Sequence, residues 1–131
     1  MVGIVIVSHS KKAAEGIREL AVQMSGEGQQ IIAAGGVEDG SIGTDAVKIR
    51  DAIKEADTGE GVLVMVDLGS AVLSTNMAIE LLTESGSKAI VKIADAPVLE
   101  GAISAAVQAS IGDSIEGVAA AAEEARSLHK A

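Results

Sequence analysis

Residues 2–7 read VGIVIV, an almost unbroken apolar run, and residues 8–10 then read SHS. A largely β-branched run of this length predicts a central strand of a parallel sheet, buried on both faces. In open α/β sheets, reactive groups lie just beyond the carboxyl ends of such strands. His9 occupies that position, whereas the other histidine, His129, lies two residues from the end of the sequence. His9 is therefore the first candidate for a functional side chain.

The composition predicts one folded domain, residues 1–131, with a substantial core. Apolar residues make up 48% of the sequence, which excludes disorder for most of the chain. There is no cysteine, so disulfides and thiolate chemistry are excluded. No apolar run reaches the roughly 20 residues of a membrane span, and no basic segment precedes the first apolar run as in a signal peptide. We therefore expect a cytoplasmic protein without a membrane partner.

The charge and the missing aromatic residues narrow the possible partners. A net charge of −9 disfavours nucleic acid and favours a basic protein partner, although an acidic surface that maintains solubility explains the same charge. Phenylalanine, tryptophan and tyrosine are absent. Aromatic stacking on a base, a sugar or a nicotinamide ring is therefore excluded, and aliphatic side chains must fill the core.

Apolar periodicity, glycines and the single proline divide the chain into alternating strands and helices. Strands are expected at residues 2–7, 30–34, 62–66 and 88–93, and helices at 11–25, 45–57, 71–82, 98–110 and 115–128. The expected N-caps are Ser10, Thr44 and either Asp113 or Ser114. This alternation predicts an α/β fold, an open three-layer sandwich with a four-stranded, mainly parallel sheet and helices on both faces. The expected strand order is 2-1-3-4, with the topological switch between the first and third strands.

This order makes neighbours of His9 and Asp67, since each follows one of the two central strands. A histidine acts as a general base, a metal ligand or a covalent nucleophile. A metal site needs more ligands than this pair, and acyl transfer needs a cysteine or a G-x-S-x-G motif, both of which are absent. The glycine-rich loop at 35–43 lacks the ending of a Walker loop, which argues against an ordinary nucleotide site. A histidine nucleophile towards phosphorus fits better, with Asp67 holding one ring nitrogen.

Three further residues are expected to bind the phosphate: Ser10, Gly69 and Ser70. The helices that begin after Ser10 and Ser70 would supply N–H groups and favourable dipoles, and Gly69 would allow a close backbone approach. Each residue also has a simpler interpretation. Ser10, Ser70 and Asp67 are all good helix caps, and His9 can be an ordinary hydrogen-bonded loop residue.

Three motifs, in this order along the chain, resemble one protein family. They are VIVSHS at 5–10, the stretch with GG at 35–36, DG at 39–40 and IGT at 42–44, and VDLGSA at 66–71. Together they resemble DhaM, the phosphotransferase subunit of dihydroxyacetone kinases that depend on the phosphoenolpyruvate phosphotransferase system (PTS). That family is similar in fold to the IIA domains of mannose-family PTS proteins. Those domains carry a Gly-Gly-Ser-Pro type of turn where this chain has LGSA at 68–71, which favours DhaM.

The resemblance implies a phosphohistidine at His9, with the phosphoryl group on Nε2 and Asp67 on Nδ1. Phospho-HPr would charge it, drawing on phosphoenolpyruvate through enzyme I. The group would pass to ADP bound on the DhaL subunit, whose ATP phosphorylates dihydroxyacetone (glycerone) held on DhaK. The resemblance thus implies no cofactor on this chain, because ADP and Mg²⁺ lie on the partner subunit.

The resemblance also implies an assembly. Enzyme I and HPr are expected to be separate proteins, and the chain is expected to form a homodimer. The alanine-rich stretch 102–122 is a candidate surface for self-association, and a monomeric mass in light scattering would exclude it.

Three other functions stay open. A IIA component of a mannose-type sugar transporter has the same chemistry, with a IIB domain as acceptor. A receiver-like switch would be phosphorylated on Asp67, although such switches carry an acidic pair after the first strand, where this chain has SHS at 8–10. A non-catalytic module would hold a small ligand in the glycine-rich loop.

Overall fold

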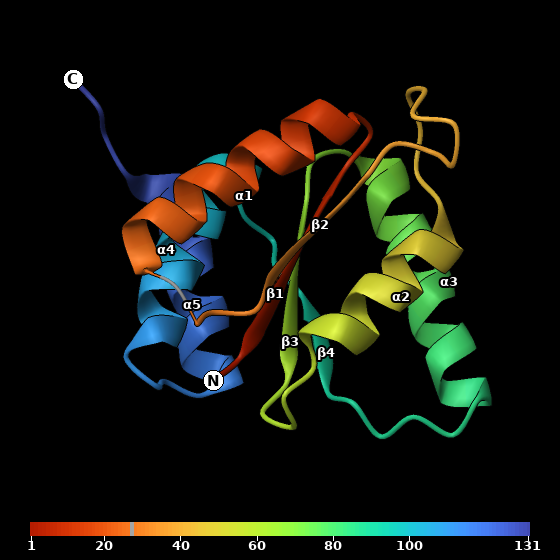
Figure 1. The fold of residues 1–131 in the computed structure, drawn as a ribbon. Helices are drawn as coiled ribbons and strands as arrows, with labels where there is room; N and C mark the ends of the chain where they lie inside the picture. Colours follow the sequence, from red (N-terminus) through yellow and green to blue (C-terminus); the bar gives the residue numbers. More distant parts are fainter. Residues whose placement is uncertain (27) are drawn as a thin grey trace.

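The computed structural model describes residues 1–26 and 28–131 and confirms the predicted α/β architecture. One sheet of four parallel strands has the order β2-β1-β3-β4. Helices α1, α4 and α5 cover one face of the sheet, and α2 and α3 cover the other (Figure 1). The strands are β1 (Gly3–Ser8), β2 (Ile31–Gly35), β3 (Val62–Val66) and β4 (Val91–Ile93). The helices are α1 (Lys11–Ser25), α2 (Ala46–Ala56), α3 (Gly69–Glu84), α4 (Val98–Ser110), α5 (Ile115–Glu124) and the short 3₁₀ helix η1 (Ala125–Ser127).

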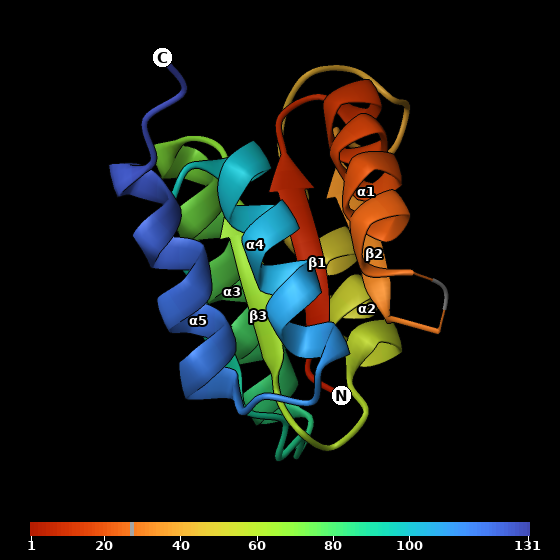
Figure 2. The same cartoon turned by 90° about the vertical axis from the view of Figure 1, so that its left-hand side faces the viewer.

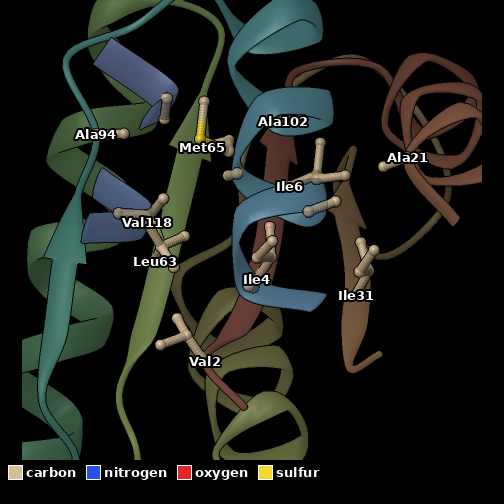
Figure 3. Close-up of a cluster of buried hydrophobic side chains, with 14 of the residues drawn as sticks. Val2, Ile4, Ile6, Ala21, Ile31, Leu63, Met65, Ala94, Ala102 and Val118 are labelled. Carbon is tan, nitrogen blue, oxygen red and sulfur yellow. The ribbon is translucent and has the colours of Figure 1, made fainter. Parts of the chain in front are cut away.

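Side chains that alternate along the central strands form two apolar cores, one on each face of the sheet. In β1, Ile4 and Ile6 belong to the core under α1, α4 and α5, whereas Val5 and Val7 belong to the core under α2 and α3. All four side chains are fully buried. In the first core, side chains of β1 and β3 meet small residues such as Ala102 of α4 (Figure 3). Burial on both faces explains why β1 is apolar at nearly every position.

Small residues let α4 lie close to the sheet, between α1 and α5 (Figure 2). A Cβ at Gly101 would come within 2.7 Å of Met65 Cε. The alanines that follow Gly101 on this face are fully buried, namely Ala102, Ala105, Ala106 and Ala109. In the 102–111 part of the expected dimer surface, the alanines therefore pack inside the chain, whereas Val107 and Ile111 are exposed.

Several element boundaries differ from those expected. The strand expected at 88–93 is limited to Val91–Ile93, and the helix expected at 71–82 begins two residues earlier and ends two residues later. The last helix ends at Glu124 and tightens into η1, a common ending that apolar spacing does not reveal. In the described residues, 1–26 and 28–131, the structure contains no helix with both the length and the apolar character of a membrane span.

The N-caps agree with the prediction except at α2. Ser10 caps α1 and Ser114 caps α5. For α2 the cap is Asp45, whose carboxylate accepts two N–H groups of the first turn at 2.9 and 3.3 Å. The prediction that Thr44 caps this helix is therefore wrong. The Thr44 hydroxyl lies 2.6 Å from the hydroxyl of Ser74 on α3 instead.

Two cations from opposite layers cover the outer edge of β2. Arg18 of α1 donates from Nε to the carbonyl of Ile31 at 2.6 Å, and Lys48 of α2 donates from Nζ to the carbonyl of Gly35 at 2.8 Å. Successive carbonyls of a strand point to opposite edges of that strand. The carbonyl of Gln30 accepts the N–H of Ile4 and therefore points towards β1. The carbonyls of Ile31 and Gly35, one and five residues later, point away from β1. Positive side chains at a free strand edge prevent pairing with another chain.

Glycine at position 35 lets α1 begin directly against the end of β2. A Cβ at Gly35 would lie 2.6 Å from the carbonyl oxygen of Ser10 and 2.7 Å from the Cβ of Ala14. Real Cβ atoms do not approach other atoms so closely, so any larger residue would displace the start of α1. Because α1 begins two residues after His9, this packing also fixes where His9 lies.

We expect Gly35→Ala to destabilise the chain by about 1–3 kcal/mol, because overpacking against backbone has no flexible neighbour to relieve it. The measurement is the free energy of unfolding in urea. Gly16→Ala is the matched control, since a Cβ at this α1 position meets no atom within 4 Å and alanine favours a helix by about 1 kcal/mol over glycine. The control should gain stability, and a Gly35→Ala chain as stable as the wild type would contradict the close packing.

Candidate functional site

The ends of β1 and β3 bring His9 and Asp67 together at the carboxyl edge of the sheet. β1 pairs with β3 so that Val7 lies opposite Val66, which places the residues that follow each strand side by side. The side chains of His9 and Asp67 keep 19% and 20% of their surface exposed. The pair is therefore held by the protein and still reachable from solvent.

Asp67 binds the imidazole ring of His9. Asp67 Oδ1 lies 2.9 Å from His9 Nδ1, and Asp67 Oδ2 accepts the backbone N–H of His9 at 3.0 Å. An ionised carboxylate can only accept hydrogen bonds, so the ring hydrogen is assigned to Nδ1. The strand order correctly predicted this contact between residues 58 positions apart.

Two more donors complete the hydrogen bonds to Asp67. Ser8 Oγ donates to Oδ2 at 2.9 Å, and the backbone N–H of Leu68 donates to Oδ1 at 2.7 Å. Sequence reasoning misses the role of Ser8. The signal that could have found it is that Ser8 is the one polar residue of β1, and the structure buries it to 3% exposure.

These contacts lower the pKa of Asp67. Partial burial raises the pKa by penalising the charged form, but the hydrogen bonds from the backbone and ring of His9, from Ser8 and from Leu68 outweigh it, so that the pKa lies below the ordinary value of 3.8. Asp67 is thus ionised at neutral pH and presents a full negative charge to the imidazole ring.

Ser70 lies at the second ring nitrogen. Its Oγ, in the first turn of α3, forms a hydrogen bond with Nε2 of His9. Because Nδ1 keeps its hydrogen, Nε2 is bare and accepts the hydrogen of the Ser70 hydroxyl. A Cβ at the neighbouring Gly69 would meet no atom within 4 Å, so the start of α3 is open there. The lone pair of Nε2 thus lies beside a helix N-terminus, whose N–H groups and dipole favour anions.

Ser10, Asp67 and Ser70 are each also possible helix caps by sequence, and only Ser10 is one. Ser10 caps α1, because its hydroxyl accepts the N–H of Ala13 at 3.1 Å. At α3 the N-cap position is Leu68, which makes no side-chain cap bond. The side chains of Asp67 and Ser70 bind His9 instead.

The glycine-rich loop holds the backbone around His9. Gly36 donates its N–H to the carbonyl of Ser8 at 3.2 Å, and Gly43 donates its N–H to the carbonyl of His9 at 2.9 Å. Both glycines have positive φ angles, 72° and 144°, which other residues rarely adopt. The loop therefore clamps the end of β1, a role that its composition did not reveal.

Exposed apolar side chains border the site, and we call them the apolar rim. Leu73 and Met77 of α3 lie three and seven residues after Ser70, on the same helix face, and are 68% and 58% exposed. Leu68 is 63% exposed, and Ile42 in the glycine-rich loop is 75% exposed. Exposed apolar patches of this kind mark surfaces that contact partners.

The polar groups of the site do not extend into a metal site. In residues 1–26 and 28–131, no three histidine, cysteine, aspartate or glutamate side chains gather closely enough to hold a metal ion.

The lowered pKa of Asp67 predicts a specific loss of stability in acid. The stabilisation is fully present above the unfolded value of about 3.8 and is lost as the pH falls through the lower folded pKa. The amide side chain of the Asp67→Asn variant cannot titrate, so the stability difference between the wild type and this variant should shrink between about pH 5 and pH 2. Urea unfolding of both chains over this range measures it, and a difference that does not change with pH would contradict the hydrogen-bonded carboxylate.

The sequence and the fold both match known proteins. A family model, EIIA-man, described as "PTS system fructose IIA component", matches residues 3–119. The phosphoryl donor subunit DhaM of PEP-dependent dihydroxyacetone kinase 2 from Listeria innocua is 44% identical over 119 residues, which cover 90% of this chain and 94% of that relative. The phosphoryl donor subunit DhaM from Escherichia coli is 45% identical over 122 residues, which cover 90% of this chain.

The two relatives differ in length. The match covers 25% of the Escherichia coli protein, so the chain corresponds to about a quarter of it. Among solved structures, the crystal structure of a protein of unknown function, EF1359, matches with a TM-score of 0.81 and 39% identity, covering 95% of both chains. The chain therefore belongs to the EIIA-man family and, within it, to the DhaM group.

Proposed function

We propose that this chain carries a phosphoryl group on Nε2 of His9, between a phosphorylated protein donor and a nucleotide acceptor. The contact between Asp67 and Nδ1 is the observation that carries the proposal, because it leaves Nε2 as a bare nucleophile at an accessible surface. The names of the relatives, which are phosphoryl donor subunits, support the same role.

In the first step, the lone pair of Nε2 attacks the phosphorus of phospho-HPr. The bond from phosphorus to the donor nitrogen breaks, and its electron pair returns to the donor imidazole. His9 loses no proton, since Nδ1 keeps its hydrogen on Asp67, whose negative charge balances the charge that develops on the ring. Phosphoryl transfer asks mainly for such positioning and charge stabilisation.

In the second step, an oxygen of the β-phosphate of ADP on a DhaL subunit attacks the phosphorus. The bond to Nε2 breaks, its electrons return to the ring, and ATP forms. That ATP then phosphorylates dihydroxyacetone held on DhaK. ADP and Mg²⁺ belong to the partner in this scheme, and His9 carries the phosphoryl group without a bound cofactor.

Three residues are proposed to bind the phosphoryl group. Ser70 would turn its hydroxyl from Nε2 to a phosphoryl oxygen, and the backbone at Gly69 would add its N–H. Ser10 would contribute the start of α1, since its own hydroxyl is engaged as the cap. The homodimer and the cytoplasmic location that the resemblance implies are part of the same proposal.

The geometry disfavours a receiver-like switch. A phosphoacceptor aspartate needs a free carboxylate oxygen, and both oxygens of Asp67 accept two hydrogen bonds each. A sugar-transport IIA component would use the same site, so the acceptor has to be identified by assay.

The deciding experiment is a reconstituted transfer assay. The chain is mixed with enzyme I, HPr and phosphoenolpyruvate, then with DhaL carrying ADP, DhaK and dihydroxyacetone, and dihydroxyacetone phosphate is followed. We expect dihydroxyacetone phosphate from the wild type and only background amounts from His9→Ala, because that variant has lost the nucleophile. The matched control is His129→Ala, which should keep the wild-type rate, since His129 lies in the exposed tail.

The stability of the phosphoryl group identifies the residue that carries it. An acid-labile, base-stable phosphate that His9→Ala abolishes supports the carrier. A base-labile phosphate on Asp67 would overturn it in favour of the switch. If phosphohistidine forms but dihydroxyacetone phosphate never appears, ADP on DhaL is not the acceptor. That result would favour the alternative in which a IIB domain accepts the phosphoryl group.

The apolar rim should be needed for transfer between proteins. We expect Leu73→Asp to slow transfer from phospho-HPr by about ten-fold, because a charge replaces an exposed apolar side chain beside the histidine that the partner must reach. Ile90→Asp is the matched control, since Ile90 is 58% exposed and lies just before β4, at the opposite end of the sheet from His9. Rapid-quench measurement of phosphohistidine formation gives both rates, and equal slowing by the two substitutions would argue against docking at the rim.

A further inference from the structure

The hydroxyl of Ser8 connects separate segments of the chain at a buried position. In the described part of the chain, the buried polar side chains are Ser8 and Thr75. Thr75 donates to the carbonyl of Ala71 in its own helix, a local contact. Ser8 instead links the start of α1 to the end of β3, because its Oγ contacts both the N–H of Ser10 at 3.1 Å and Asp67 Oδ2 at 2.9 Å.

The direction of these hydrogen bonds is fixed by their chemistry. Asp67 accepts only, so the Ser8 hydroxyl must donate its hydrogen to Oδ2. The N–H of Ser10 donates only, so it uses a lone pair of the same hydroxyl. Asp67 Oδ1 then accepts the hydrogen of His9 Nδ1. Two series of donors therefore converge on the carboxylate of Asp67, one from Ser10 through Ser8 to Oδ2 and one from the imidazole ring to Oδ1. In the first series, the hydrogen bond from Ser10 polarises the Ser8 hydroxyl and strengthens its hydrogen bond to Oδ2.

Ser8 is well placed to hold Asp67 still. The backbone of Ser8 belongs to β1, and its carbonyl accepts the N–H of Gly36, so a rigid strand carries the hydroxyl. Without this hydroxyl, Oδ2 would keep the backbone N–H of His9 and lose its second donor. The carboxylate could then turn, and the ring nitrogen that it orients would no longer be fixed.

We propose that Ser8 is a positioning residue, which holds the Asp67 carboxylate so that His9 keeps its hydrogen on Nδ1 and leaves Nε2 bare. The effect on phosphoryl transfer rests on the proposed function above. The position of the ring hydrogen does not, because it is a property of the free chain.

The ring hydrogen can be located directly by long-range proton–nitrogen NMR of the nitrogen-15-labelled chain, at a pH where the imidazoles are neutral. The sequence contains two histidines, so the exposed His129 is an internal reference for an unconstrained ring. We expect His9 of the wild type to be protonated on Nδ1. Ser8→Ala should shift His9 towards the tautomer mixture of His129, and Ser8→Thr, which restores a hydroxyl, should reverse the shift.

Two comparisons separate positioning from general damage. Ser114→Ala removes the cap of the distant α5, lowers stability by about 1 kcal/mol and should leave the His9 tautomer unchanged. In an Asp67→Asn background, Ser8→Ala should add no further change, because Ser8 acts through Asp67. A tautomer unchanged by Ser8→Ala would overturn the proposal, as would an equal shift caused by Ser114→Ala.

The rate of phosphohistidine formation provides the second measurement. We expect Ser8→Ala to lower it by about ten-fold, comparable to the smaller losses seen when a partner that orients a metal-binding histidine is removed, and Ser8→Thr to recover it. A wild-type rate in Ser8→Ala would overturn the effect on transfer. If no chain were phosphorylated while the tautomer shifted as expected, the carrier function would fail and the positioning of His9 by Ser8 would stand.

Discussion

The carboxylate of Asp67 joins the ends of the two central strands. It accepts hydrogen bonds from Ser8, the last residue of β1, from His9, which follows it, and from Leu68 after β3. This is possible because the parallel register sets Val7 beside Val66, so that both chains leave the sheet at the same level. The site is consequently a product of strand order as much as of side-chain chemistry. A sheet with another order would separate His9 from Asp67 however favourable the two residues are for each other.

The fold and the central pair could be predicted because strong signals coincide in them. The apolar run before Ser8 requires burial on both faces, and a strand with helices on both sides provides it. Regular alternation of strands and helices then leaves few permitted topologies. The position of His9 and Asp67 after two neighbouring strands follows from that topology alone. The sites of close packing are consistent with the same pattern, since Gly35 and Gly101 both lie where a helix meets the sheet.

The finer parts of the site could not be predicted because they depend on which of several similar groups is within reach. Thr44 and Asp45 are both good caps, and the choice is made by Ser74, thirty positions away, which engages the Thr44 hydroxyl. Ser70 and Asp67 resemble caps in sequence, yet His9 lies close enough to bind both. For Ser8, no sequence pattern distinguishes a buried hydroxyl from an ordinary polar residue at the end of a strand. Its role appears once its hydroxyl is placed between Ser10 and Asp67.

The covered edge of β2 has a consequence for how the chain reaches its folded state. Arg18 and Lys48 approach that edge from helices on opposite faces of the sheet. Both contacts are therefore made only after both helices have docked. A partly folded chain with one helix in place would still offer half an open edge to a neighbouring molecule, and such species are the usual origin of aggregation. Docking of the second helix, whichever comes last, therefore ends the stage of folding in which this edge is open to misassembly.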